Sequence, residues 1–422
     1  MASTNPARGM RDFLPADVRK REYVIGIIKE VYESYGFEPL ETPAVENLET
    51  LTGKYGEEGN QLIFKILKRG EKLDLSGAAK ESDLSDLALR YDLTVPLARV
   101  VANNKNELPK FFKRYQIQRV WRADRPARGR FREFYQCDVD CIGSDSLIVE
   151  AEIISAAGEI LSKLGFVDFE IRINHRELLR SIVATAGIQN ETDALVALDK
   201  LDKIGSDGVK NELLGRGISE VSADRFLDAI RSGSSNDDLD TVQRLCVGLP
   251  IRIDPSLARG LSYYTGTIME IVLTEGDFKG SIGGGGRYDG LIGMFGKEQI
   301  PACGFSLGFE RILVVMEERG MFPPEIADST PADVMVTIWS SETIHESLRL
   351  AHELRSRGLR VTMYPEPDKL GKQIKYADSI RVPWVCVLGD SELADSTVTV
   401  KNMRTGDQQT IARDRAASAI QK

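Results

Sequence analysis

The chain has 422 residues, enough for roughly two or three domains, and 55 basic against 64 acidic residues leave a net charge of −9. Its composition, 42% hydrophobic and 28% charged, indicates a globular protein and excludes collagen-like, mucin-like and disulfide-scaffold chains. The acidic total disfavours nucleic-acid binding at first sight, because phosphate contacts need concentrated Lys and Arg.

No targeting or membrane segment is apparent. The first 15 residues lack the apolar core of a signal peptide, and no stretch approaches the roughly 18 uninterrupted apolar residues of a membrane helix. The five cysteines form no CxxC pair, which suits a reducing compartment. His345 and His352 have no third ligand near them in sequence, so no structural zinc is expected. We therefore expect a cytoplasmic protein without membrane contact.

Helix and strand patterns alternate in the first part of the chain. Apolar residues at helical spacing predict helices over 17–35 and 147–164, each closed by a glycine. Between them, 115–121 and 133–142 are typical of strands. The polar segment 68–86, rich in Gly and Ser, is predicted to be a loop.

The organisation changes twice further along. Residues 186–250 contain seven basic and twelve acidic residues in helical patterns, and we interpret them as an all-helical insertion in a core domain spanning 1–325. A strand follows at 267–273. Beyond a linker at 326–331, residues 332–422 alternate as β-α-β-α-β, which predicts a small, separate α/β domain.

The segment 105–133 concentrates positive charge. It contains ten basic and three acidic residues inside an acidic chain. An ordinary solvated charge run is one interpretation. The other is a cationic loop between two strands that binds polyphosphate, because Arg donates paired hydrogen bonds to phosphate oxygens. The loop sequence, with its proline and glycine, favours the second interpretation.

The strand that follows has two unlike faces. Alternation puts Tyr135, Cys137, Val139 and Cys141 on an apolar face, and Phe134, Gln136, Asp138, Asp140 and Ile142 on the other. A solvent-exposed sheet face would explain those polar residues. So would a pocket for a cationic or hydrogen-bonding ligand, into which Arg122 could also point.

Four further segments could contribute to a site. They are 89–96 with Asp92 and Thr94, RGLSYYTG at 259–266, SIGGGGRYDG at 281–290, and GFSLGFERIL at 304–313 with Arg311. The glycine run permits positive φ and close approach to a ligand, but a tight hairpin explains it equally well. A surface arginine is the ordinary interpretation of Arg311. No Ser-His-Asp set is apparent, so an Arg-rich site points to electrostatic stabilisation at phosphorus.

Taken in order, these segments resemble the class II aminoacyl-tRNA synthetases, and specifically the histidyl-tRNA synthetase family, over essentially the whole chain. GFEPLETPAVE (36–46) resembles motif 1, RVWRADRPARGRFREFYQCDVD (119–140) motif 2, and GFSLGFERIL motif 3. LARGLSYYTG and GGGGRYDGL are similar to the two histidine-specific signatures. All of them in this order are far more specific than any one alone.

The resemblance implies an antiparallel catalytic sheet with flanking helices, a helical insertion and a C-terminal anticodon-binding α/β domain. It implies two reaction steps. L-histidine and ATP, with Mg2+, give histidyl-adenylate and pyrophosphate, and the histidyl group then moves to the 3′ end of tRNA(His). The family pattern also implies a homodimer.

Site roles follow from the resemblance residue by residue. Arg122 and Arg259 occupy the catalytic arginine positions, both facing the α-phosphate. The ATP-binding positions are Arg122, Arg130, Phe134 and Arg311. The histidine-binding positions are Asp92, Thr94, Gln136, Asp140, Tyr263, Tyr264 and Tyr288. Ser262 replaces the acid usual in the RGLDYY signature, so we expect local support there to differ.

Three alternatives compete with this interpretation. A non-catalytic paralogue, such as the regulatory subunit of ATP phosphoribosyltransferase, shares the catalytic fold, but such paralogues lack the C-terminal domain and tend to lose the arginine found here as Arg259. A synthetase for proline or threonine would share the C-terminal domain type, while RGLSYYTG with Asp140 favours histidine. A pure RNA-binding module fits the ATP-site arginines least.

Overall fold

A computed structural model describes residues 3–52, 56–73, 75–76, 81–259, 264–296, 298–328 and 330–421. The chain folds as two compact units, Met1–Phe322 and Pro323–Lys422. No helix among the described residues is long and apolar enough to cross a membrane.

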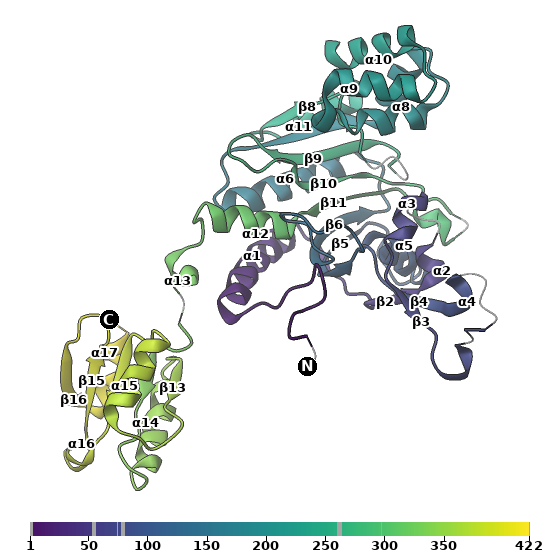
Figure 1. The fold of residues 1–422 in the computed structure, drawn as a ribbon. Coiled ribbons are helices and arrows are strands. Elements are labelled where there is room, and N and C mark those ends of the chain that lie inside the picture. Colours follow the sequence, from purple (N-terminus) through teal and green to yellow (C-terminus); the bar gives the residue numbers. More distant parts are fainter. Residues whose placement is uncertain are drawn as a thin grey trace. The chain divides into compact units, whose positions relative to one another are not determined.

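The first unit is built on an eight-stranded sheet in the order β1-β5-β6-β11-β10-β9-β7-β8 (Figure 1). Its strands are β1 (Glu38–Pro39), β5 (Phe112–Trp121), β6 (Glu133–Ile142), β7 (Phe169–His175), β8 (Ile251–Ile253), β9 (Thr267–Leu273), β10 (Ser281–Arg287) and β11 (Ala302–Leu307). All pairings from β5 to β7 are antiparallel, and only the outer pairings β1–β5 and β7–β8 are parallel. The predicted antiparallel sheet of an α+β domain is therefore confirmed.

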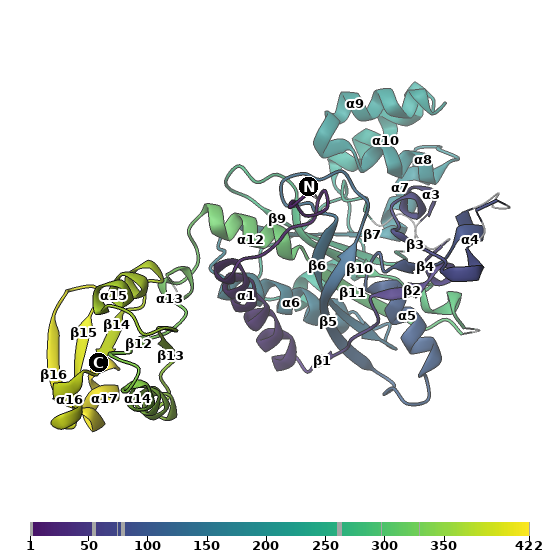
Figure 2. The same ribbon diagram turned by 60° about the horizontal axis from the view of Figure 1, so that its bottom comes forward.

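One face of this sheet is covered by long helices. They are α1 (Pro15–Ser34), α6 (Ile148–Lys163) and α12 (Phe309–Glu318), which lie together in Figures 1 and 2. Cys137 and Val139 on this face of β6 are fully buried, and the Tyr32 hydroxyl donates to the Cys137 carbonyl. The apolar stripe that predicted α1 is thus the stripe that packs on the sheet. The opposite face of β6 is left for its polar residues.

A smaller three-stranded sheet has the order β2-β4-β3. This region comprises β2 (Val45–Asn47), β3 (Lys65–Leu67), β4 (Ser85–Leu89), α2 (Leu48–Leu51), α3 (Gly56–Gln61), η1 (Gly70–Lys72), α4 (Glu81–Leu84) and α5 (Thr94–Asn103). A further turn, η2 (Ile292–Met294), contacts α5. The predicted loop 68–86 contains η1, α4 and the start of β4, while residues 74 and 77–80 lie outside the described residues.

The helical region comprises α7 (Arg176–Thr185), α8 (Glu191–Leu198), α9 (Leu201–Gly215), α10 (Glu220–Ser232) and α11 (Asp237–Leu245). Buried residues of α7 to α10 share one hydrophobic cluster, which reaches Ile268 of the sheet. Helix α7, before residue 186, therefore packs with the expected insertion. Helix α11 instead contacts α6, β7 and β8. Its apolar stripe, which includes Leu239 and Val242, is buried.

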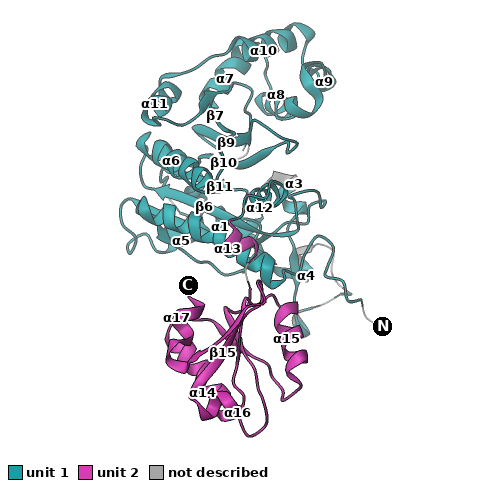
Figure 3. Ribbon diagram, turned by 90° about the vertical axis from the view of Figure 1, so that its left-hand side faces the viewer, with its two compact units in different colours: residues 1–322 teal, residues 323–422 magenta. Residues whose placement is uncertain are grey.

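The second unit holds a five-stranded sheet in the order β13-β12-β14-β15-β16 (Figure 3). It comprises α13 (Pro324–Ala327), β12 (Val334–Val336), α14 (Ile344–Ser356), β13 (Val361–Met363), α15 (Leu370–Ser379), β14 (Trp384–Val387), α16 (Asp390–Ala394), β15 (Thr397–Asn402), β16 (Gln408–Ala412), η3 (Arg413–Arg415) and α17 (Ala416–Ile420). Strands β12, β13 and β14 are parallel, which confirms the β-α-β-α-β prediction. The antiparallel pair β15–β16 was not predicted.

Candidate active site

A cavity of about 320 Å3 opens on the polar face of the eight-stranded sheet. Its walls come from β6, β10, β11, the loop between β5 and β6, and the start of α12. Among the predicted site residues, those that line it are Asp92, Thr94, Arg122, Arg130, Phe134, Gln136, Asp140, Tyr264, Tyr288 and Arg311. Of the two interpretations of the polar strand face, the structure therefore supports the pocket.

Buried carboxylates form the floor of this cavity. Asp138 and Asp140 on β6 are each 3% exposed. The Asp140 carboxylate pairs with Arg114 at 2.7 Å, measured from Oδ2 to Nη2, and it also accepts a hydrogen bond from the Tyr288 hydroxyl. The Gln136 amide donates to Asp138 Oδ1 at 3.1 Å. The floor therefore has charged and polar partners within the protein, although Asp140 Oδ2 contacts Arg114 as an ion pair and accepts no hydrogen bond.

The protonation of these carboxylates is shifted by their surroundings. Burial raises the pKa of Asp140 to about 6, against the opposing effect of the Arg114 guanidinium and with a further increase from the charge of Asp138. Burial also raises the pKa of Asp138, again opposed by Arg114. A group whose pKa lies near neutrality inside a cavity is typical of a functional site.

Arg122 directly follows the end of β5. It lies between the opening of the cavity, called the mouth below, and its floor. Its Nε donates to the Tyr91 carbonyl at 3.0 Å, and its Nη2 donates to Gln136 Oε1 at 2.9 Å. The guanidinium carbon also lies 4.4 Å from the centre of the Tyr91 ring and 5.2 Å from that of Phe134. These partners are neutral, so the positive charge of Arg122 remains available to an anion.

Arg259 and Arg311 converge on one serine. Both donate from Nη1 to the Ser281 hydroxyl, at 3.1 and 3.2 Å, and Arg311 Nη1 also donates to the Ser281 carbonyl at 2.5 Å. Arg259 does not line the cavity but pairs with the buried carboxylate of Glu270 at 2.7 Å. Ser281 does line the cavity, so Arg259 is tied to its edge.

Positive charge accumulates at this end of the cavity. Burial lowers the pKa of Arg311, and Arg130, Arg259 and Arg122 lower it further. Guanidinium groups that repel one another in this way are stabilised by a bound polyanion, because its oxygens replace the mutual repulsion with paired hydrogen bonds.

The glycine run occupies the middle of a strand and does not form a hairpin. Gly283 to Gly286 all lie in β10, and none has a positive φ. A Cβ at Gly285 would lie 2.2 Å from the Gly304 carbonyl oxygen, and one at Gly286 would lie 2.5 Å from that of Thr267. The hairpin interpretation, and the positive φ that would suit it, are therefore wrong. Glycine is needed at 285 and 286 because the backbones of the neighbouring strands approach too closely for a side chain there, whereas a Cβ at Gly284 would make only an ordinary contact.

Asp92, Thr94 and Tyr264 add further polar groups to the cavity. Asp92 is buried, and its Oδ1 accepts from the Val95 amide at 3.1 Å, next to the start of α5. Thr94 and Tyr264 also line the cavity. Tyr263 and Ser262 lie outside the described residues.

Sequence reasoning missed the residues that face the floor from β5. Arg114 pairs in register with Asp140, Gln116 with Asp138, and Gln118 with Gln136. The signal was present, since Arg114, Gln116 and Gln118 alternate with Tyr115 and Ile117 along the strand. The positive charge of 105–133 includes Arg114 but does not indicate where its side chain points, whereas the alternation along β5 does.

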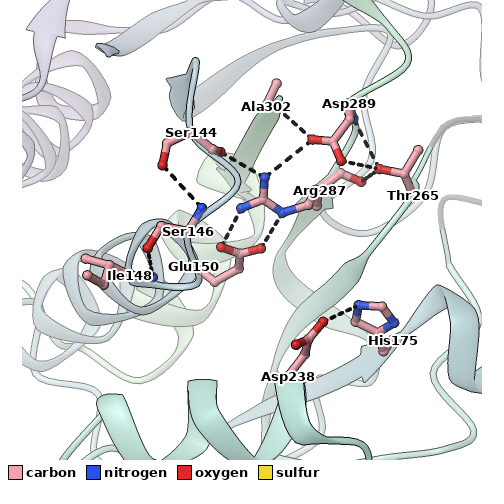
Figure 4. Close-up of polar contacts among 10 residues, drawn as sticks. All are labelled: Ser144, Ser146, Ile148, Glu150, His175, Asp238, Thr265, Arg287, Asp289 and Ala302. Atoms are coloured by element: carbon pink, nitrogen blue, oxygen red, sulfur yellow. Dashed lines mark hydrogen bonds and ion pairs between the residues drawn. The ribbon is translucent and has the colours of Figure 1, made fainter. Parts of the chain in front are cut away.

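A buried ion pair fixes the chain just before Tyr288 (Figure 4). Arg287 donates from Nε and Nη2 to the two oxygens of Glu150, each at 2.7 Å, and from Nη1 to the Ser144 carbonyl at 3.0 Å. Glu150 is completely buried in α6. This two-point contact ties the end of β10, and with it Tyr288, to a helix on the other face of the sheet.

The antiparallel sheet, the arginine-rich cavity on its open face and the separate α/β unit together define a class II aminoacyl-tRNA synthetase. The family model for histidyl-tRNA synthetase matches residues 9–312, and the model for an anticodon binding domain matches 333–422. The chain therefore belongs to the histidyl-tRNA synthetase family.

Individual relatives agree with this assignment. The chain is 41% identical to the histidine–tRNA ligase of Christiangramia forsetii over 437 residues, covering 95% of each chain. It is 43% identical to that of Porphyromonas gingivalis over 447 residues, covering 97% of each. The crystal structure of histidyl-tRNA synthetase from Nostoc sp. PCC 7120 matches 100% of this chain and 99% of its own, with a TM-score of 0.80 and 32% identity.

Proposed function

We propose that this chain is a histidine–tRNA ligase, which activates L-histidine with ATP and transfers it to the 3′ end of tRNA(His). The observation that carries the proposal is a single cavity with arginines at one end and buried carboxylates at the other. That arrangement suits a reaction between a polyphosphate and a small molecule that donates hydrogen bonds. Membership of the histidyl-tRNA synthetase family supports histidine as that molecule.

At the cationic end we assign the residues to ATP. Arg122 would hold the α-phosphate, and Phe134, beside it, would stack on the adenine. Arg311 would pack on the other face of the ring and reach the γ-phosphate, with Arg130 adding charge. Arg259 would neutralise the charge that develops at the α-phosphate when the carboxylate of histidine attacks it, and a cation fixed in that position lowers the barrier.

At the other end we assign the residues to histidine. Asp92, Thr94 and Gln136 would receive the α-ammonium group, since all three line the cavity. Asp140, with Tyr264 and Tyr288, would bind the imidazole, and we assign Tyr263 to the same end from the family pattern. The link from Arg122 to Gln136, at 2.9 Å, supports the view that the two substrates meet there.

We further propose that Mg2+ enters with ATP. Mg2+ binds phosphates with several waters and one or two carboxylates, and does not require a cage made of protein alone. Among the described residues no group of three or more His, Cys, Asp or Glu side chains could hold a metal. The ion would supply charge neutralisation at the phosphates.

The remaining partners are proposals of the same kind. The second unit, which matches the anticodon-binding model, would bind the anticodon of tRNA(His). A homodimer would form through residues 36–46, where β1 is the exposed edge of the large sheet and Val45 is exposed. An uncovered edge strand favours association with another chain. Sedimentation at micromolar concentration tests the dimer, and we expect the protein to work in the cytoplasm.

Specific features separate this proposal from the regulatory paralogue. Arg259, which such paralogues tend to lose, is present and tied to the edge of the cavity through Ser281, and the C-terminal unit matches an anticodon-binding model. A regulatory protein would have no need to keep a catalytic arginine in that position.

The deciding experiment is pyrophosphate exchange with each of the twenty amino acids in turn. Exchange with histidine alone is expected, followed by charging of tRNA(His) in the presence of ATP. Exchange with proline or threonine instead, or with none of them, would overturn the proposal.

A further inference from the structure

We propose that Arg114 is a positioning residue for the amino-acid end of the cavity. It balances one of the two carboxylates of the floor, so that Asp140 stays ionised and correctly oriented toward the bound side chain. This inference rests on the proposed function, because it concerns how the same cavity recognises histidine. Arg114 does not line the cavity and acts through Asp140.

The placement of Arg114 indicates a specific ion pair with Asp140. Its side chain is 0% exposed, one of the largest in the chain to be fully buried. It lies opposite Asp140 in the β5–β6 register, and Nη2 lies 2.7 Å from Oδ2. Its other contacts are long, 3.4 Å to Gln116 Oε1 and 3.5 Å to the Leu93 carbonyl. The ion pair with Asp140 therefore dominates its surroundings.

The charge balance of the floor explains why a cation is needed there. Asp138 and Asp140 lie two residues apart on one face of β6, and both are nearly inaccessible to water. Like charges this close cannot both ionise in a dry site unless a cation compensates one of them. With Arg114 charged and both carboxylates ionised, these three groups sum to −1. Without Arg114, the carboxylates of Asp138 and Asp140 would share one proton.

Arg114 also helps to orient the carboxylate of Asp140. Arg114 occupies the Oδ2 side of Asp140, and the Tyr288 hydroxyl donates to Oδ1. A carboxylate held on both sides cannot rotate, so its remaining lone pairs keep one direction. A Cβ on Gly304 would lie 1.9 Å from Asp140 Oδ1, so the strand on the other side is also shaped around this group. A ring N–H of the substrate would therefore meet a fixed acceptor.

The test is a charge-balance experiment in the full-length protein. Arg114→Met removes the cation, and Arg114→Met with Asp138→Asn restores a floor of charge −1. Arg119→Met is the matched control, because Arg119 lies on the same strand, is about half exposed and pairs with Glu133. The measurement is pyrophosphate exchange, with KM determined separately for histidine and for ATP.

We expect Arg114→Met to raise KM for histidine by about tenfold or more, equivalent to about 1.4 kcal/mol, with KM for ATP within about twofold of the parent value. The double variant should return KM for histidine to within about threefold of the parent. Arg119→Met should change neither KM. A merely structural role would raise both constants together and would not be rescued by a second substitution.

Three outcomes would overturn the inference. They are an unchanged KM for histidine in Arg114→Met, an equal rise in both constants, and a double variant as poor as the single one. If Arg114→Met does not fold, the double variant decides alone, with a KM for histidine more than about tenfold above the parent counting against us. Failure of the proposed function is separate, since it shows in the parent protein as exchange with another amino acid.

Discussion

The two ends of the cavity handle charge in opposite ways. At the cationic end, Arg122 and Arg311 are held by neutral acceptors, the carbonyls of Tyr91 and Ser281 and the Ser281 hydroxyl. At the floor, Asp140 is already paired with a buried arginine and hydrogen-bonded to a tyrosine. One end keeps its charge for the ligand, and the other compensates its charge within the protein.

Exposure to water explains the difference. The side chain of Arg259 is 46% exposed, whereas that of Asp140 is 4% exposed. Arg259 still pairs with one carboxylate, that of Glu270. Arg122 and Arg311 are only partly buried, so water stabilises their guanidinium groups without an internal anion for each one. An unpaired charge at the floor would cost several kcal/mol. At the floor, Asp140 is therefore paired with Arg114 before the ligand binds.

The largest expected effect concerns the buried pair Arg287–Glu150, which anchors the floor. Glu150→Gln should lower the free energy of unfolding by about 3–5 kcal/mol, because it leaves the buried Arg287 charge with only the partly exposed Asp289, 3.4 Å away, as a counter-ion. The control is Asp228→Asn, whose partner Arg231 is on the surface, with side chains 71% and 61% exposed. That change should cost at most about 1 kcal/mol. Denaturant unfolding of the first unit measures both, and equal losses would contradict the contrast.

The next largest effect is on the rate of pyrophosphate exchange, and it concerns Arg259 at the mouth of the cavity. Arg259→Ala should slow pyrophosphate exchange by about 10²–10³-fold, because a fixed cation at the developing charge is lost. KM for histidine should change little, since Arg259 lies outside the cavity floor. Stability should fall, because the buried carboxylate of Glu270 loses its ion-pair partner.

Arg252→Ala provides the matched control for this variant. Arg252 is 50% exposed and pairs with Glu170 and Asp254 on the same sheet, but does not contact Ser281. It should exchange at the parent rate. If Arg259→Ala also kept the parent rate, the catalytic assignment of Arg259 would be wrong.

Much of this layout could be predicted from the sequence. The helical stripe of α1 and the alternation along β6 are local patterns, and both described the structure correctly. The parity of β6 alone placed Gln136, Asp138 and Asp140 on one face, which is the face that the cavity opens on. The arginines of the β5–β6 loop were recognised because cationic side chains concentrate there.

Other features depend on contacts between distant strands and were out of reach. The pairing of Arg114 with Asp140 requires the β5–β6 register, which a sequence pattern does not state. The glycine run is explained by the close approach of β10 to β11, whose paired residues lie about twenty positions apart in the chain. A local interpretation of glycine as a turn former was therefore wrong for a packing reason.

The third prediction concerns the glycines of β10, which line the cavity between its cationic end and its floor. Gly285→Ala should destabilise the protein by about 1–3 kcal/mol or more, because its Cβ would clash with the backbone of β11. Gly284→Ala is the control in the same strand, since the nearest atom to its Cβ would be 3.6 Å away, an ordinary contact. Thermal unfolding compares the two. If both were equally stable, close strand approach would not explain the glycine run.

The smallest effect is a shift in pH dependence that only the floor should show. Arg114 from β5, Asp138 from β6, Tyr288 after β10 and Asp92 before α5 all influence or contact Asp140, whose pKa is raised to about 6. Below that pH the carboxyl is protonated and loses its charge, so KM for histidine should rise as pH falls through about 6.

Asp138→Asn separates this titration from that of the substrate. The variant removes a neighbouring negative charge, which lowers the pKa of Asp140, so the rise in KM should begin at a lower pH than in the parent. The imidazole of free histidine also titrates, near 6.5, but it does so identically for both proteins and cannot produce a difference between them. The cationic end stays protonated throughout, since arginine does not titrate in this range. An inflection at the same pH in both proteins would mean that Asp138 and Asp140 are not electrostatically coupled, and that the floor is no more sensitive to charge than the mouth.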